Sequence, residues 1–211
     1  MSREVLLYTG FEKFLKHKYN PSEMLAQRLN DQEIGDLRVV GEVIPLRYYD
    51  IPSIIRQLID KHSPNALIMS GLAGRNCLSI EKVAINYANS KGSPYNCGSK
   101  PAGEILQEDG ADAYFSKLPI TDLIKVLRKK GIPVEESLSA GSYGCNQIFY
   151  EAMYYLDRNG YDIPAGFIHV PHIPSQVTNG STPSLPFELQ LEGMTAIIEY
   201  LSKWMNTRSR Y

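Results

Sequence analysis

Continuous apolar runs mark the expected strands of this chain. Short apolar runs between polar turns are typical of strands that lie buried within a sheet. Runs of this kind, some of them interrupted by a polar residue, predict strands at residues 5–9, 38–46, 66–70, 114–118, 134–138 and 165–170.

Apolar residues at helical spacing lie between these strands. Pro21 follows Asn20, a good capping residue, so a helix is predicted to begin there. A stripe of isoleucine and leucine from Ile51 to Ile59 predicts a helix that stops before Pro64. Further helices are predicted at residues 122–130 behind a Thr121 cap, from Cys145 to Gly160, and at residues 187–204.

Residues 78–87 depart from this rhythm and predict one alternating strand. On such a strand Glu81 falls on the same face as Val83, Ile85 and Tyr87. A carboxylate on an apolar face is costly unless another group pairs with it. The other interpretation is that Glu81 lies near the strand end and reaches water.

Strands that alternate with helices predict a three-layer α/β/α sandwich around a central sheet, largely parallel or mixed. No internal repeat or linker divides the chain, so residues 1–211 are expected to form a single domain. Two irregular segments, residues 89–112 and 171–185, predict long loops, which in compact domains are usually functional or poorly ordered.

Composition excludes several classes of protein. The 211 residues are 43% hydrophobic and 21% charged, as in an ordinary globular chain. The net charge of −1 gives no reason to expect binding to nucleic acid or to an anionic membrane. Apolar runs stay well short of the ~20 residues of a membrane span, and the start has no signal-peptide layout.

The three cysteines are Cys77, Cys97 and Cys145, which lie far apart without a CxxC pair. Their odd number and spacing argue against a disulfide framework and against a structural zinc site. A reducing cytoplasm, in which thiols stay free, is therefore the expected location.

The segment from Ser137 to Phe149 carries the strongest chemical signal. Small, turn-permissive residues follow the predicted strand, and after Cys145 the apolar spacing becomes helical. A cysteine at a strand-to-helix turn lies beside free backbone N–H groups and the positive end of the helix dipole. Both effects lower a thiol's pKa, and the same N–H groups stabilise an oxyanion. Cys145 is therefore a candidate nucleophile, although a free cysteine is more often a small core residue.

Glu81 and His169 are the candidate partners of this thiol. A cysteine nucleophile needs a base, and the base needs an acid that fixes its tautomer. All three residues lie at or near predicted strand ends, where open α/β sheets place their sites. A lone histidine on an apolar strand is also often a satisfied core residue. His172 forms an H-x-x-H pair with His169, but no further ligand cluster accompanies it, so a metal is not expected.

The chain resembles pyroglutamyl peptidase I, or pyrrolidone carboxyl peptidase, a family of cysteine peptidases, over nearly its whole length. Four motifs in the same order carry the resemblance: TGFEKF at residues 9–14 with Asn20-Pro21, SIEKVAIN at 79–86, SAGSYGCN at 139–146 and GFIHVP at 166–171. By resemblance, Cys145 is the nucleophile, His169 the base and Glu81 the residue that orients the base.

The resemblance implies an exopeptidase that removes N-terminal pyroglutamate from peptides through a thiol acyl-enzyme, without metal or organic cofactor. It also implies a homodimer or homotetramer. Its substrate contacts are expected at Phe11, Phe14, Asn20, Gly71, Lys91, Tyr143 and Gly144, with the two phenylalanines as walls of the lactam pocket.

Two departures from the family pattern put the pocket in doubt. Many members have glutamine where this chain has Gly71, and arginine where it has Lys91, which cannot reproduce arginine's fork of donors. Two alternatives therefore stay open: a non-catalytic peptide- or lactam-binding protein on the same fold, and a different cysteine hydrolase of small amides.

Overall fold

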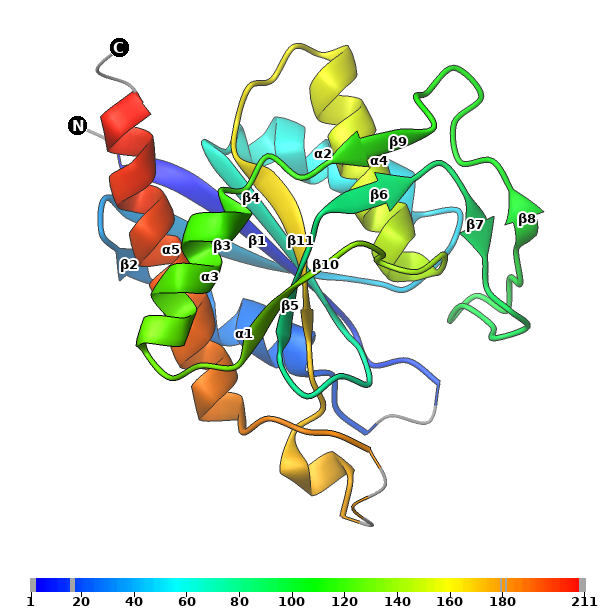
Figure 1. Cartoon of the computed structure of the whole chain (residues 1–211). Coiled ribbons are helices and arrows are strands. Elements are labelled where there is room, and N and C mark those ends of the chain that lie inside the picture. Colours follow the sequence, from blue (N-terminus) through cyan, green and yellow to red (C-terminus); the bar gives the residue numbers. More distant parts are fainter. Residues whose placement is uncertain (1–2, 16–17, 179, 181, 209–211) are drawn as a thin grey trace.

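The computed structural model describes residues 3–15, 18–178, 180 and 182–208. The helices are α1 (Pro21–Leu29), α2 (Ile51–His62), α3 (Ile120–Lys129), α4 (Gly144–Arg158) and α5 (Phe187–Arg208), with a short 3₁₀ turn at Pro174–Gln176 (Figure 1). The strands are β1 (Glu4–Phe11), β2 (Glu33–Ile34), β3 (Leu37–Ile44), β4 (Ala66–Leu72), β5 (Leu78–Glu81), β6 (Val83–Ile85), β7 (Ala88–Asn89), β8 (Ala102–Glu104), β9 (Ala113–Phe115), β10 (Val134–Ser137) and β11 (Ala165–Val170).

A seven-stranded sheet in the order β10-β5-β11-β4-β1-β3-β2 forms the middle layer. Strands β11, β4, β1 and β3 are parallel to one another. Strand β5 runs antiparallel to β11, and β2 runs antiparallel to β3. The predicted α/β/α sandwich with a largely parallel, mixed sheet is confirmed.

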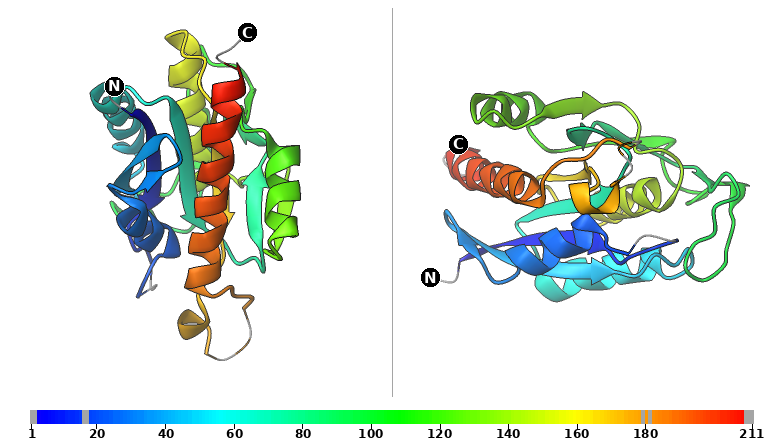
Figure 2. Two further views of the ribbon diagram at one scale, coloured as in Figure 1. Left: turned by 90° about the vertical axis from the view of Figure 1, so that its left-hand side faces the viewer. Right: turned by 90° about the horizontal axis from the view of Figure 1, so that it is seen from below.

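Helices cover both faces of this sheet (Figure 2). Strand β1 shows why, because its apolar side chains alternate between two hydrophobic cores. Leu6 and Tyr8 pack in the core that α1, α3 and α5 cover, whereas Leu7 and Phe11 pack in the core under α2 and α4. Burial of apolar residues on both faces explains the uninterrupted apolar run in the sequence.

The single strand predicted at residues 78–87 is wrong, because the chain leaves the main sheet at Lys82. Its N–H donates to the Ser137 carbonyl at 2.7 Å, and its carbonyl accepts from the N–H of Ser116 at 2.9 Å. Strand β6 then pairs with β9 in a separate two-stranded sheet. Alternation cannot reveal this break, since a strand continues on either side of it. Glu81, at the end of β5, is fully buried and does not reach water.

Two predicted caps have different outcomes. Asn20 caps α1 as predicted, with its Oδ1 accepting a hydrogen bond from the N–H of Ser22 at 3.1 Å. The Thr121 cap is wrong, because α3 begins at Ile120 behind Pro119, which has no side chain to cap with. Proline's fixed φ already suits a helix start there.

No helix within the described ranges is long and apolar enough to cross a lipid bilayer.

Candidate active site

Helix α4 begins at the turn that follows β10, and Cys145 is its second residue. The helix starts at Gly144, which lies so close to Leu46 that a Cβ atom would collide with that side chain. The first backbone N–H groups of a helix have no hydrogen-bond partner within the helix. Those of α4 can therefore donate hydrogen bonds near the thiol. The sequence therefore predicted the local setting of Cys145 correctly.

The thiol of Cys145 lies against the backbone of strand β4. A Cβ atom placed on Gly71 would be only 2.7 Å from Cys145 Sγ and 2.9 Å from Phe167 Cζ. Gly71 is the cross-strand partner of His169, and the His169 ring packs edge-on against Phe167 with 4.9 Å between ring centroids. Glycine at position 71 thus leaves the space in which the thiol approaches strands β4 and β11.

His169 and Glu81 form a buried hydrogen-bonded pair. The distance between His169 Nδ1 and Glu81 Oε1 is 2.6 Å, and both side chains are almost wholly excluded from solvent. A carboxylate bound to Nδ1 fixes the tautomer that leaves Nε2 as the basic nitrogen. The pairing of these two residues is the arrangement a thiol nucleophile requires.

The three residues meet for a different reason from the one the sequence suggested. Strand β5 runs antiparallel to β11, so the ends of these two strands point in opposite directions. Ser79 pairs with His169, which makes Glu81 a diagonal neighbour of His169 on the same face of the sheet. That face lies under helix α4, which brings Cys145 to it.

Burial dominates the acid–base properties of this cluster. Burial and then the Glu81 carboxylate raise the pKa of Cys145 to about 12, whereas Arg75 and the cysteine's own N–H lower it. Burial also lowers the pKa of His169 below its ordinary value, although the hydrogen bond that His169 donates to Glu81 acts in the opposite direction. The expected lowered thiol pKa is therefore wrong, because desolvation outweighs the helix terminus. A neutral thiol beside a neutral imidazole is the favoured resting state.

Arg75 is a residue of this site that the sequence analysis missed. Its Nη2 lies 3.0 Å from Glu81 Oε1, the same oxygen that binds His169. The cost of burying an unpaired carboxylate pointed to some partner for Glu81, and the structure shows that Arg75, in the turn after β4, supplies it.

A cleft of about 350 Å³ lies beside the start of α4. It is lined by Phe14, Leu15, Asn89, Ser90, Lys91, Ser93, Ser142 and Tyr143. Three of the residues expected to bind substrate, Phe14, Lys91 and Tyr143, thus come together there. The Phe14 and Tyr143 rings are 6.5 Å apart between centroids, and the Tyr143 hydroxyl donates to the Pro94 carbonyl at 2.7 Å.

The other expected substrate contacts lie around the cleft and do not line it. Phe11 is buried at the end of β1, with Cδ2 3.5 Å from a Cβ placed on Gly71. It therefore flanks the same glycine as the thiol. Asn20 is fully buried, and its Nδ2 donates to the Glu12 carbonyl at 3.0 Å. Asn20 thus holds the loop between Phe11 and Phe14 in place.

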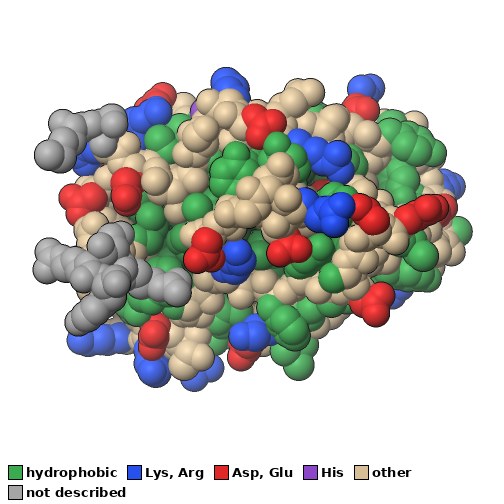
Figure 3. Space-filling view, turned by 90° about the horizontal axis from the view of Figure 1, so that it is seen from above, with side chains coloured by type: hydrophobic (Ala, Val, Ile, Leu, Met, Phe, Trp, Pro, Cys, Tyr) green, Lys and Arg blue, Asp and Glu red, His purple; other side chains and the backbone are tan. Residues whose placement is uncertain are grey.

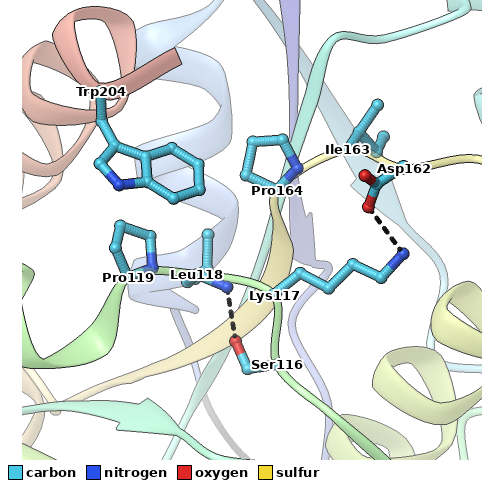
Figure 4. Close-up of a pocket in the computed structure, with 8 residues that line it drawn as sticks. All are labelled: Ser116, Lys117, Leu118, Pro119, Asp162, Ile163, Pro164 and Trp204. Atoms are coloured by element: carbon cyan, nitrogen blue, oxygen red, sulfur yellow. Dashed lines mark hydrogen bonds and ion pairs between the residues drawn. The ribbon is translucent and has the colours of Figure 1, made fainter. Parts of the chain in front are cut away.

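A larger hollow lies elsewhere, at the amino-terminal end of β11. This groove of about 520 Å³ runs past Trp204, Pro119 and Pro164 (Figure 4). Its charged residues, Lys117 and Asp162, pair with each other at 3.4 Å. Its lining includes neither a cysteine nor a histidine, so size alone does not identify the site. Within the described part of the chain, no three His, Cys, Asp or Glu residues are grouped so as to hold a metal ion.

Comparison with known proteins gives consistent matches. Residues 4–204 match the family model for pyroglutamyl peptidase. The pyrrolidone-carboxylate peptidase of Bacillus licheniformis is 38% identical over 195 residues, covering 92% of this chain and 90% of that protein. The Lactobacillus helveticus protein of the same name is 36% identical, covering 92% and 96%.

Solved structures give the same result. Pyrrolidone carboxyl peptidase from Pyrococcus furiosus superimposes with a TM-score of 0.91 at 36% identity, covering 94% of this chain and 98% of that one. The Thermococcus litoralis structure of the same name gives 0.93 at 31% identity, covering 97% and 96%.

Proposed function

The chain belongs to the pyroglutamyl peptidase family, and from that premise we propose that Cys145, His169 and Glu81 form its catalytic unit. The protein is a cysteine peptidase that removes pyroglutamate from the N-terminus of peptides. The observation that carries the proposal is the buried 2.6 Å contact between His169 Nδ1 and Glu81 Oε1, on the sheet face to which α4 brings the thiol.

In the proposed reaction, His169 accepts the thiol proton as Cys145 Sγ attacks the carbonyl carbon between pyroglutamate and the next residue. Proton transfer accompanies attack because the resting thiol and imidazole are both neutral. Glu81 stabilises the imidazolium that forms, and the first N–H groups of α4 stabilise the oxyanion. His169 then protonates the leaving amine as the C–N bond breaks. Water, deprotonated by His169, hydrolyses the thioester and releases pyroglutamate.

We propose that the cleft beside α4 receives the pyroglutamyl ring. Phe14 and Tyr143 supply aromatic walls, which suit a flat five-membered lactam. The lactam nitrogen carries no charge, and the residues that line the cleft include no carboxylate for a charged amino terminus. Phe11, Asn20, Gly71 and Gly144 support these walls and the thiol.

The test is hydrolysis of a pyroglutamyl chromogenic amide before and after alkylation of Cys145. Cys97 is exposed, and although burial raises its pKa, hydrogen bonds with Ser99 lower it overall. The Cys97→Ser variant is therefore the right background, because alkylation of Cys97 would otherwise confuse the result. Activity should disappear in proportion to Cys145 modification. Full activity after complete alkylation of Cys145 would refute the proposal.

A prolyl amide separates this function from that of a general small-amide hydrolase. Proline has the same ring size, but it lacks the lactam carbonyl and brings a positive charge into an apolar slot. Sites built around hydrogen bonds reject analogues that lack them by roughly 10⁴-fold, so prolyl amides should be at least roughly a thousandfold poorer in kcat/KM. Similar values for the two amides would favour the general hydrolase. Family membership does not favour the alternative of a non-catalytic binding protein.

We also propose that the enzyme is a cytoplasmic homodimer or homotetramer. The three cysteines are free thiols, as the reducing cytoplasm allows. Val83 and Phe115 are cross-strand partners in the β6–β9 sheet, and Phe115 is 66% exposed. Hydrophobic side chains also reach the surface between charges of both signs on the face in Figure 3. Exposed apolar faces mark interaction sites. Light scattering after gel filtration tests this, and Phe115→Lys should reduce the assembled fraction.

A further inference from the structure

Arg75 connects three segments that meet around the candidate thiol site. It lies in the turn after β4, and its side chain is 25% exposed. Nη2 contacts Glu81 Oε1 on β5 at 3.0 Å and donates to the Ser139 carbonyl at 3.2 Å. Nη1 contacts Glu135 Oε1 on β10 at 3.4 Å. Ser139 belongs to the turn that leads from β10 into α4, six residues before Cys145.

The contact with Glu81 is the most consequential of these. Glu81 is fully buried, and its Oε1 contacts both His169 Nδ1 and Arg75 Nη2. Its Oε2 has no hydrogen-bond partner among the described residues. One carboxylate oxygen therefore holds the imidazole and the guanidinium together. A buried carboxylate with a single engaged oxygen depends strongly on each of its partners.

We propose that Arg75 is a positioning residue for the reaction: its guanidinium aims the Glu81 carboxylate at His169 and ties that pair to the turn that leads into α4, the helix of Cys145. This inference rests on the proposed function, since it assigns Arg75 to the same catalytic unit. Lysine would not replace it fully, because one ammonium lacks the planar fork that reaches Glu81, Glu135 and Ser139 together.

Arg75 also affects both titrating groups of the unit in the same direction. Desolvation is the main influence on both groups, and the guanidinium lowers the pKa of Cys145 and of His169. The charged groups that act on His169 are Glu81 from β5 and Arg75 from the turn after β4, and Cys145 from α4 lies beside Gly71, the strand partner of His169. Gly71, the residue of β4 that pairs with His169, has no side chain that could carry a charge. Cys77 and Glu135 also interact with Arg75. Removal of the guanidinium should therefore move the titration of thiol and imidazole to higher pH.

The experiment measures the rate of Cys145 alkylation by iodoacetamide against pH, in the Cys97→Ser background, for wild type, Arg75→Gln and Arg75→Lys. Iodoacetamide is uncharged, so loss of a cation does not change its attraction to the site. In Arg75→Gln the profile should shift upward by about half a unit to one unit, and alkylation near neutral pH should slow roughly three- to tenfold. Arg75→Lys should restore the profile and keep a roughly tenfold loss in kcat at unchanged KM.

Arg56→Gln is the matched control. Arg56 pairs with the buried Glu151 at 3.3 Å, so its loss also removes the charged partner of a buried carboxylate, but away from the thiol. This variant should lower the melting temperature and leave the alkylation profile unchanged. An Arg75→Gln profile that coincides with wild type would reduce Arg75 to a structural role. If Arg75→Gln does not fold, an unchanged kcat in Arg75→Lys would overturn the proposal.

The alkylation series needs no substrate. If wild type fails to hydrolyse pyroglutamyl amides, the proposed function fails, while the profiles still test whether Arg75 tunes the thiol.

Discussion

Two buried glutamates, each paired with an arginine, differ in how their oxygens are used. Glu81 offers one oxygen to both His169 and Arg75, and its other oxygen has no hydrogen-bond partner among the described residues. Both oxygens of Glu151, on α4, accept from Gln107 Nε2 at 2.9 Å, and Oε2 also contacts Arg56 at 3.3 Å. The first carboxylate holds a histidine that can change its charge. The second holds an amide and a guanidinium.

The Glu151 cluster anchors the long loop that was expected to be functional or poorly ordered. Helix α4 fixes this segment at several further points. The Tyr150 hydroxyl donates to the Ala111 carbonyl at 2.6 Å, and Tyr154 and Arg158 both contact Asp109. The loop starts with the residues that line the proposed lactam cleft. One helix therefore carries the nucleophile at its start and anchors a pocket loop along its length.

The comparison teaches that burial of a charged pair does not by itself indicate catalysis. Burial raises the pKa of Glu151, while its bonds to Gln107 and Arg56 lower it. What distinguishes Glu81 is a partner that titrates, an unused oxygen and a neighbouring thiol. Loss of the Glu81 cluster should therefore reduce catalysis, whereas loss of the Glu151 cluster should change stability.

The largest expected effect comes from removal of the thiol. Cys145→Ala should lower kcat/KM for a pyroglutamyl amide by roughly 10⁴-fold or more, because no other nucleophile replaces it. Cys77, which is buried and has a raised pKa, provides the matched control. Cys77→Ala should stay within about threefold of wild type. A Cys145→Ala variant that keeps its activity would show that the cluster of Glu81, His169 and Cys145 does not carry out the reaction.

The second-largest expected effect is the difference in kcat between variants of the two glutamates. Glu81→Gln should lower kcat by roughly 10²–10⁴-fold, because the amide cannot stabilise the imidazolium or fix the same tautomer. Glu151→Gln should leave kcat within about threefold. Steady-state kinetics of the two variants on the same substrate make the comparison. Equal losses in both would abolish the distinction.

A double variant sharpens the claim that Glu81 acts through His169. Since residues of one catalytic unit are not additive, Glu81→Gln with His169→Ala should be only about threefold worse than His169→Ala alone. Multiplied losses would give Glu81 a separate role.

The smallest effect concerns stability and pH at the second cluster. The raised pKa of Glu151 means that the folded protein binds a proton more tightly there than the unfolded chain. The carboxylate's contribution to stability is therefore greatest below its ordinary pKa of 4.5 and is lost as pH rises through the raised value. Urea unfolding of wild type and Glu151→Gln should show wild type losing stability relative to the variant as pH rises above 4.5. A difference that is constant with pH would contradict this.

Local chemistry was predictable from the sequence, but partners across strands were only partly so. The apolar runs located the central strands, and the small residues before Cys145 located the start of α4. The break at Lys82 was not predictable, because strand alternation continues through it. The antiparallel direction of β5, which sets the diagonal neighbours of His169, depends on long-range pairing that no local pattern encodes. Arg75 and Glu151 were missed because a single charged residue in a turn or helix normally faces solvent.

The most direct test of the central claim is to find where the pyroglutamyl group is attached during turnover. An activated pyroglutamyl ester should give a burst of released alcohol, because acylation then outpaces hydrolysis of the thioester. Acid quenching followed by peptide mass spectrometry should locate the pyroglutamyl group on Cys145, and Cys145→Ala should give neither burst nor adduct. A burst with unmodified Cys145, or the pyroglutamyl group on another residue, would contradict the account.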